Sequence, residues 1–274
     1  MVGAPNEDGP LLWDSDRMDL FSIEGKTALV TGGSRGIGLM IATGFVEAGA
    51  TVYVSSRNAD ACAEAVAALN ERGPGRAIAL PADLSAFEES DRVATELGSQ
   101  LEKLDILVNN AGSNWGEDYE TFSEKAWDRC LDLNLKGTFA LTRALTPLLA
   151  AAASDEDPAR VINIGSIDGL RVPEMETYSY STSKAAVHHL TKVLARKLAP
   201  KRITVNAVAP GPFESKMMAA TLDAFGDMIR ATCPLGRIGE PSDMAGIAIF
   251  LSSKAGAYLT GTVIPVDGGI STTR

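Results

Sequence analysis

Tyr180 and Lys184 are spaced for proton-transfer chemistry. They stand at positions i and i+4 of a segment with helical spacing, so they share one face of a helix, about one turn apart. A phenol with its ordinary pKa of about 10 is protonated at neutral pH and is a poor base. An ammonium about 4 Å away, at an effective dielectric constant near 20, is worth about 4 kcal/mol, or about three pKa units. We therefore expect Lys184 to lower the pKa of Tyr180 into the working range of a general acid or base.

A glycine-rich turn near the start of the chain is the second chemical signal. The apolar run Thr27–Thr31 leads into the sequence GGSRGIG and then into a helical pattern. Glycines permit a tight turn and close backbone approach, and a helix N-terminus presents free N–H groups to a pyrophosphate. The context between a strand and a helix favours a dinucleotide site. The expected contacts from this turn are Gly32, Ser34, Arg35, Gly36, Ile37 and Gly38.

The residues after the second expected strand indicate which dinucleotide binds. NAD sites usually place an acidic side chain there for the ribose 2′-hydroxyl. In this chain Arg57 follows Thr51–Ser55, and no carboxylate occurs before Asp60. Arg57 and Arg35 could hold a 2′-phosphate with charge-assisted hydrogen bonds, whereas a carboxylate would repel it. We therefore predict NADP(H) as the cofactor, with NAD(H) less favoured.

Strands and helices alternate from the glycine-rich turn onward. Apolar runs predict strands at 27–31, 51–55, 77–80, 106–108, 160–164, 204–209 and 263–266. Helical spacing predicts helices at 36–48, at a segment ending near 71, and at 88–101, 127–153, 179–198 and 242–251. This repetition predicts an α/β fold: one doubly wound, Rossmann-like parallel sheet with helices on both faces. We expect a tail over 1–19, a single domain over 20–274, and a substrate lid over about 212–232.

Further motifs follow in a fixed order. They are the pair Asp83-Leu84, the sequence NNAG at 109–112, Asn134 within LDLNLKGTF, Ser166, YSTSK at 180–184, Pro210-Gly211, and the late Asp267-Gly268-Gly269. From about Leu20 to its end the chain resembles the short-chain dehydrogenase/reductase family, and especially its 3-oxoacyl reductase branch. The resemblance implies a hydride transfer between nicotinamide and a carbonyl or alcohol carbon.

The resemblance implies a catalytic set of Asn134, Ser166, Tyr180 and Lys184. Tyr180 would exchange the proton, and Lys184 would also hold the nicotinamide ribose. Ser166, at the end of a strand, could donate a hydrogen bond to the substrate carbonyl as charge develops there. Asn134 would support a water relay that returns the proton through Lys184.

The same resemblance implies the remaining cofactor contacts. Asp83 and Asn110 match positions that flank the adenosine half, together with their neighbours Leu84, Ala111 and Gly112. Pro210 and Gly211 would close over the nicotinamide. Phe213 and Ser215 stand where the family usually has Ile and Thr, and Phe213 is the bulkier residue at its position.

Composition excludes several other classes of protein. The 274 residues carry a formal net charge of −10, which repels phosphate backbones and argues against nucleic acid as a partner. No apolar run is long enough to span a bilayer, and the N-terminus lacks signal-peptide features, so we expect a cytoplasmic protein. Cys62, Cys130 and Cys233 have neither metal-type nor disulfide spacing. His188 and His189 diverge by about 100° on a helix, so we expect interface or surface residues and no metal.

The substrate and the assembly are less tightly specified. Segments Ser113 to Trp115, Asp168 to Glu176 and Phe213 to Arg230 are expected to wall the pocket. Their apolar members suit an acyl or alicyclic ketone; they are Trp115, Leu170, Met175, Phe213, Met217, Met218 and Met228. Lys216 and Arg171 could attract the arm of an acyl carrier. A polyol, sugar or steroid dehydrogenase and a non-catalytic dinucleotide sensor are the alternatives. Surplus apolar residues on the helices at 127–153 and 179–198 predict a homotetramer or homodimer.

Overall fold

The predicted strands form one parallel sheet. The computed structural model describes residues 19–214 and 218–273, and its 7-stranded sheet has the order β3-β2-β1-β4-β5-β6-β7. The strands are β1 (Thr27–Thr31), β2 (Thr51–Ser55), β3 (Arg76–Ala79), β4 (Ile106–Asn109), β5 (Ala159–Ile164), β6 (Ile203–Pro210) and β7 (Val263–Val266). The strand order reverses at β1, between β2 and β4, and ligands of such sheets bind beyond the carboxyl ends of the strands at this point.

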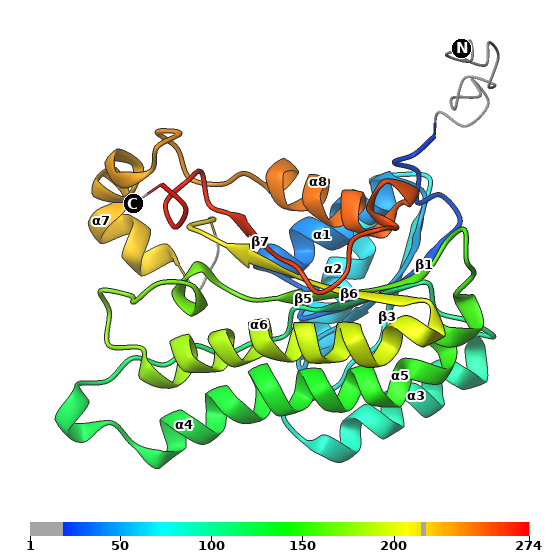
Figure 1. Ribbon diagram of the computed structural model, residues 1–274, viewed down its shortest axis with the longest axis horizontal. Helices are drawn as coiled ribbons and strands as arrows, with labels where there is room; N and C mark the ends of the chain where they lie inside the picture. The colour runs from blue at the N-terminus through cyan, green and yellow to red at the C-terminus, as the bar shows by residue number, and fades with distance from the viewer. Residues whose placement is uncertain (1–18, 215–217, 274) are drawn as a thin grey trace, which may run out of the picture.

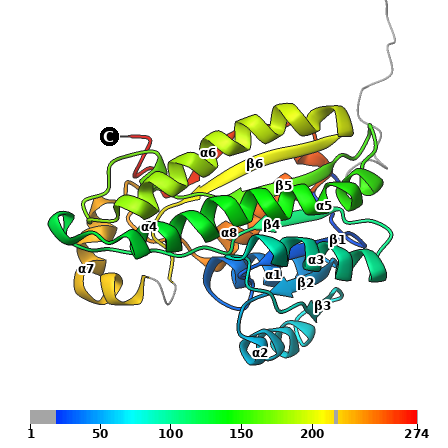
Figure 2. The ribbon, with the colours of Figure 1, turned by 90° about the horizontal axis from the view of Figure 1, so that it is seen from below.

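Helices cover both faces of the sheet, which explains why the strands read as continuous apolar runs. Figures 1 and 2 show α1 (Gly36–Glu47), α2 (Ala59–Asn70) and α8 (Pro241–Ser252) on one face. The other face carries α3 (Phe87–Gln100), α5 (Thr138–Ala152) and α6 (Tyr178–Leu198). Each face buries its own core, one around Phe45 and Met244 and the other around Leu97, Leu145 and Leu194. The predicted doubly wound fold is confirmed.

The helix expected at 127–153 is interrupted. It consists of α4 (Glu124–Leu131), the π-helical segment η3 (Asp132–Gly137) and α5. π-Helical turns are rare and occur mainly at functional sites. This one contains Asn134, which is 1% exposed.

The expected lid segment contains a helix that the sequence did not predict. α7 (Ala219–Thr232) lies apart from the two helical layers, beside the carboxyl ends of the strands (Figure 1). On its N-terminal side Phe213 bridges to Gly239, whose N–H donates to the carbonyl of Pro212 at 2.9 Å. The two ends of the lid segment, at Pro212-Phe213 and at Gly239, are therefore joined to each other.

A buried arginine joins the N-terminal end of β5, opposite the candidate site, to the end of α8. Arg160, at the start of β5, is 1% exposed. Its guanidinium donates to the carbonyls of Leu251 at 3.1 Å and Ser253 at 2.9 Å, at the end of α8, and to Asp157 at 3.0 Å. These bonds satisfy carbonyls that the helix end leaves free.

Candidate active site

The glycine-rich turn joins β1 to α1 and leaves room for a ligand. Gly32 and Gly36 adopt φ angles of 63° and 52°, which L side chains rarely tolerate. A Cβ added to Gly38 would lie 2.4 Å from both Asn110 Nδ2 and the carbonyl oxygen of Gly32. α1 begins at Gly36 with no acidic side chain in its first turn and no side-chain cap from Arg35. The turn therefore keeps backbone N–H groups available and fits a dinucleotide phosphate.

Asn110 holds this turn in place. Its Nδ2 donates to the carbonyls of Thr31 at 2.8 Å and Gly32 at 3.2 Å. The Thr31 hydroxyl accepts from the backbone N–H groups of Asn110 and Ala111, both at 2.9 Å. The sequence analysis did not identify Thr31, because a threonine in a strand carries no signal of its own.

The cationic groups expected at the 2′-phosphate are available. Arg35 and Arg57 are both exposed, and neither forms an ion pair within the part of the chain that the structure describes. Arg57 and Ser85 line a cavity of about 500 Å³ that extends to Ser113 and Arg129. Asp83 Oδ1 accepts from the Ser85 hydroxyl at 2.7 Å, which places its carboxylate beside a residue that lines this cavity.

The backbone of Leu84 and the end of β6 are tightly packed. A Cβ on Gly137 would lie 2.4 Å from the carbonyl oxygen of Leu84, so η3 approaches that carbonyl closely. Gly211 follows β6, and its N–H donates to the Val266 carbonyl at 3.0 Å. A Cβ there would lie 2.6 Å from Asp267 Cβ. Ser215 lies outside the described residues.

Ser166, Tyr180 and Lys184 meet beyond the end of β5. Ser166 precedes the short helix η4 (Ile167–Gly169), and its hydroxyl accepts from the Asp168 N–H at 3.1 Å. The Tyr180 hydroxyl faces the Ser166 hydroxyl, which lowers the pKa of the phenol. Lys184 Nζ lies 5.6 Å from the centroid of the Tyr180 ring and donates to the Ile164 carbonyl at 2.8 Å.

The expected lowering of the Tyr180 pKa is wrong for this structure. Burial raises the pKa of Tyr180 to about 12, the hydrogen bond with Ser166 opposes this, and the Asp168 carboxylate adds to it. Burial also lowers the pKa of Lys184 to about 8. The ammonium is directed to the Ile164 carbonyl, so desolvation outweighs its attraction for a phenolate.

Asn134 links the NNAG turn to α6. Its Oδ1 accepts from the Ser113 N–H at 2.8 Å, and its Nδ2 donates to the Ser113 carbonyl at 3.0 Å and the Ser183 hydroxyl at 2.9 Å. A Cβ on Gly112 would lie 3.4 Å from Asn134 Oδ1 and 3.5 Å from Lys184 Nζ. Asn134 and Lys184 thus approach the same turn.

Two other expectations need correction. Phe213 does not offer its ring to the pocket, because it is 2% exposed and packs in the core, where a Cβ on Gly239 would lie 2.3 Å from the ring. His188 is not a surface or interface residue, because it is 6% exposed, whereas His189 is exposed. The spacing distinguishes the two histidines, because His188 stands four residues after Lys184 and shares its face of the helix, whereas His189 points about 100° away.

The expected pocket walls differ in exposure. Trp115 lies under two cations of α4, with Arg129 Cζ 5.1 Å and Lys125 Nζ 5.9 Å from its ring centroid. Leu170 and Met175 are 45% and 59% exposed on the loop before α6, and Met228 of α7 is 54% exposed. Met217 lies outside the described residues.

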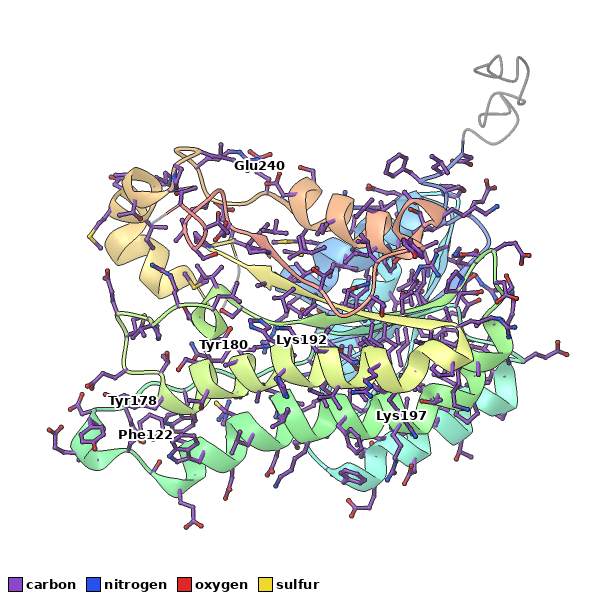
Figure 3. The ribbon with its side chains drawn as sticks, in the orientation of Figure 1. Phe122, Tyr178, Tyr180, Lys192, Lys197 and Glu240 are labelled. Atoms are coloured by element: carbon purple, nitrogen blue, oxygen red, sulfur yellow. The ribbon has the colours of Figure 1, made fainter. Side chains whose placement is uncertain are left out.

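Two tyrosines of α6 have different surroundings. Tyr178 packs edge-on against Phe122 at 5.2 Å, and its hydroxyl donates to Glu176 at 2.8 Å. Figure 3 shows Tyr178 beside Phe122, below the position of Tyr180. Lys184 stands at i+4 from Tyr180, whereas the residue at i+4 from Tyr178 is Thr182. Tyr180 is also the tyrosine that lies beside Ser166 and Lys184.

Among the described residues, no group of three or more His, Cys, Asp or Glu side chains is placed to hold a metal ion. No described helix combines the length and apolar character needed to cross a membrane.

Comparison with known proteins places these features in context. The chain matches the family described as Enoyl-(Acyl carrier protein) reductase over residues 32–271. It is 47% identical to the rhamnolipids biosynthesis 3-oxoacyl-[acyl-carrier-protein] reductase of Pseudomonas aeruginosa, over 91% of this chain and 97% of that protein. It is 33% identical to the 5-keto-D-gluconate 5-reductase of Escherichia coli, over 92% and 98%. The solved Pseudomonas aeruginosa RhlG/NADP active-site complex superimposes with a TM-score of 0.89 at 46% identity, over 92% and 98%.

Proposed function

The chain belongs to the short-chain dehydrogenase/reductase family of oxidoreductases, and we propose that it reduces a hydrophobic ketone to a secondary alcohol with NADPH. The observation that carries the proposal is the meeting of Ser166, Tyr180 and Lys184 beyond the end of β5. A sensor that only binds a dinucleotide needs no proton donor at this place.

Bound NADPH would supply the hydride that forms the new C–H bond. Tyr180 gives its phenolic proton to the carbonyl oxygen, so that C=O becomes CH–OH while NADPH becomes NADP⁺. The Ser166 hydroxyl donates a hydrogen bond to the same oxygen as negative charge develops on it. The Lys184 ammonium gives a proton to the Tyr180 phenolate and recovers one from solvent through a water relay that Asn134 supports; both side chains approach the Gly112 turn.

The raised pKa of Tyr180 supports reduction as the working direction. With a pKa of about 12 the phenol is almost wholly protonated at neutral pH and is ready to donate. Alcohol oxidation needs the phenolate, and burial beside Asp168 disfavours this form. The protonated form that reduction needs is therefore the populated one, while the phenolate that oxidation needs is scarce.

NADPH is proposed rather than NADH because of the charges around the turn. Arg35 and Arg57 are exposed and free of ion pairs in the described parts of the chain, so both can reach a 2′-phosphate. The P. aeruginosa homologue was solved with NADP. Gly32, Gly36 and Gly38 would cradle the pyrophosphate.

The proposed substrates are medium-chain 3-oxoacyl thioesters or bulky hydrophobic ketones. Leu170, Met175 and Met228 supply apolar surface on the loop before α6 and on α7. The P. aeruginosa relative is named for a 3-oxoacyl-[acyl-carrier-protein] substrate, and an acyl carrier is a possible partner of this chain too. The alternative is a sugar or polyol dehydrogenase, favoured by the likeness to the 5-keto-D-gluconate reductase.

A substrate comparison tests this proposal. The ratio kcat/KM is measured for a 3-oxoacyl thioester, a bulky alicyclic ketone and 5-keto-D-gluconate, with NADPH saturating. We expect the thioester or the alicyclic ketone to exceed the ketose at least tenfold. A clear advantage of the ketose moves the chain to the sugar branch. NADPH binding without turnover of any of the three supports the sensor.

We also propose a homotetramer, or failing that a homodimer. Phe139 of α5 and Val193 of α6 are 40% and 51% exposed on neighbouring helices, more apolar surface than packing against the sheet requires. Light scattering should report a mass several times that of one chain at micromolar concentration, and a monomer refutes the proposal. The cytoplasmic location remains a prediction.

A further inference from the structure

The end of β5 presents a backbone group that needs an unusual partner. Gly165 makes the last bond of the ladder, with its N–H donating to the Val208 carbonyl at 2.7 Å. Beyond it the chain turns into η4, and the buried N–H of Ser166 leaves the sheet. A buried N–H without an acceptor costs free energy comparable to a lost hydrogen bond. Here the acceptor is Nε2 of His188, at 3.4 Å.

The His188 ring is enclosed by the turn that carries Ser166. A Cβ on Gly165 would lie 2.1 Å from Nε2, and a Cβ on Gly169 would lie 2.8 Å from Cε1. The ring therefore occupies the space beside both glycines, Gly165 before η4 and Gly169 at its end. Only residues without a side chain at 165 and 169 leave room for it.

The ring is present as the neutral imidazole. Burial lowers the pKa of His188 to about 4, the Gly169 backbone opposes this, and the cations of Lys184 and Lys192 contribute to it. Because Nε2 accepts a hydrogen bond, the single proton of the neutral ring belongs on Nδ1. Nδ1 is buried and makes no hydrogen bond of ordinary geometry with the described residues, although the Gly169 backbone is near enough to raise the pKa of the ring.

We propose that His188 is a positioning residue for the reaction: by accepting from the Ser166 N–H and filling the space between Gly165 and Gly169, it fixes the turn that aims the Ser166 hydroxyl at the substrate carbonyl. The inference rests on the proposed reductase function. His188 contacts the backbone of Ser166 and Gly169, so we expect its main effect on turnover to pass through Ser166, with Lys184 one helical turn away as the other route. A displacement of about 1 Å at such a group can lower the rate about a hundredfold.

A double-mutant cycle tests this path. His188→Met removes the acceptor and keeps an apolar chain of similar length, and Ser166→Ala removes the hydroxyl that His188 is proposed to aim. In the wild-type background we expect His188→Met to lower kcat about tenfold with NADPH affinity changed less than twofold. In the Ser166→Ala background the same substitution should change kcat less than twofold. An equal loss in both backgrounds overturns the proposal, because interacting sites must be non-additive.

Two further variants separate positioning from packing. His188→Gln can place an acceptor near the position of Nε2 and should recover most of the lost kcat. Failure of His188→Gln to recover activity in a folded protein overturns the proposal. His189→Met, the same change at the exposed neighbour, should leave kcat unchanged. If His188→Met does not fold, His188→Asn takes its place in the cycle, since its shorter side chain does not reach Ser166.

Nuclear magnetic resonance of the ring nitrogens gives a readout independent of turnover. In the protein without cofactor, the His188 signal should report the neutral ring with its proton on Nδ1 from pH 8 to pH 5. A signal that titrates in this range, or a proton on Nε2, contradicts the contact with the Ser166 N–H. Absence of turnover by the wild-type protein would instead refute the reductase proposal and leave this contact testable.

Discussion

Replacing Tyr180 with Phe removes one hydroxyl group from the centre of the site and changes almost nothing else. The hydroxyl is the proposed source of the proton, and its hydrogen bond with Ser166 is the contact that disappears with it. Positioned general acids contribute about 10²- to 10⁴-fold to a rate. This corresponds to about 3–5.5 kcal/mol of activation free energy.

The effect on stability should be much smaller. A lost hydrogen bond between neutral groups costs about 1 kcal/mol, and removing a buried hydroxyl returns part of that cost. For a domain of this size such a change moves Tm by about 2–4 °C. A fall in kcat of a hundredfold or more therefore cannot arise from unfolding.

The assay follows NADPH absorbance with the best ketone at saturating substrate, and a separate fluorescence titration gives the NADPH Kd. Tyr178→Phe is the matched control, because it removes the same atom two residues away, where the hydroxyl is bound to Glu176 instead of Ser166. We expect the control to stay within about twofold of wild type. If Tyr180→Phe keeps more than a tenth of the wild-type kcat, Tyr180 is not the proton donor.

Four other predictions follow from the same structure. Arg57→Asp should shift the NADPH to NADH affinity ratio by about 1.5–3 kcal/mol toward NADH, through a lost charged hydrogen bond and new repulsion, and an unchanged ratio in titrations refutes the cofactor assignment. Asp168→Asn removes a charge that raises the pKa of Tyr180. More phenolate is then present at any pH below that pKa, so alcohol oxidation between pH 8 and 10 should become severalfold faster. An unchanged rate would separate Asp168 from Tyr180. Arg160→Met leaves buried carbonyls without donors and should lower the free energy of unfolding by about 3–5 kcal/mol in urea, with NADPH affinity at 25 °C retained. His188 has its pKa lowered from 6.5 to about 4, so the folded state favours the neutral ring. Its contribution to stability is complete above pH 6.5 and is lost as the pH falls toward 4, by about 3 kcal/mol at most. His188→Gln should therefore flatten the stability profile over this range.

The sequence predicted the fold well because each strand is a short apolar run between turn residues. The expected ranges for β1, β2 and β7 agree with the structure, and the other strands differ by one or two residues at their ends. α7 was missed, although Leu222, Phe225 and Ile229 of its sequence follow helical spacing. The π-helical turn was also missed, and the residues on both sides of it were assigned to one continuous helix.

In the candidate site too, contacts within one helix could be predicted from the sequence, and contacts between distant segments could not. Tyr180 and Lys184 could be identified because helical spacing alone places them together. The contact of Ser166 with His188 joins a strand end to the middle of a helix, and no local pattern encodes it. The pKa of Tyr180 was misjudged because the sequence reveals the nearby ammonium but not how deeply the phenol is buried, and burial dominates.

The π-helical segment η3 joins α4 to α5 in one continuous helical segment. The two helices contact different neighbours, and these contacts require different rotations about the helix axis. On α5 the sheet fixes the angle, through buried residues such as Leu141 and Leu145. On α4 the angle is fixed by Arg129, whose Nε donates to the Ser113 hydroxyl at 2.9 Å. One residue corresponds to about 100° of rotation about the axis. Deleting a single residue from η3 would restore a regular α-helix, turn α4 by that angle and carry Arg129 away from Ser113. The extra residue of η3 thus sets the rotation of α4 relative to α5. The surface of α4 beside the substrate loops can therefore change without altering how α5 packs on the sheet.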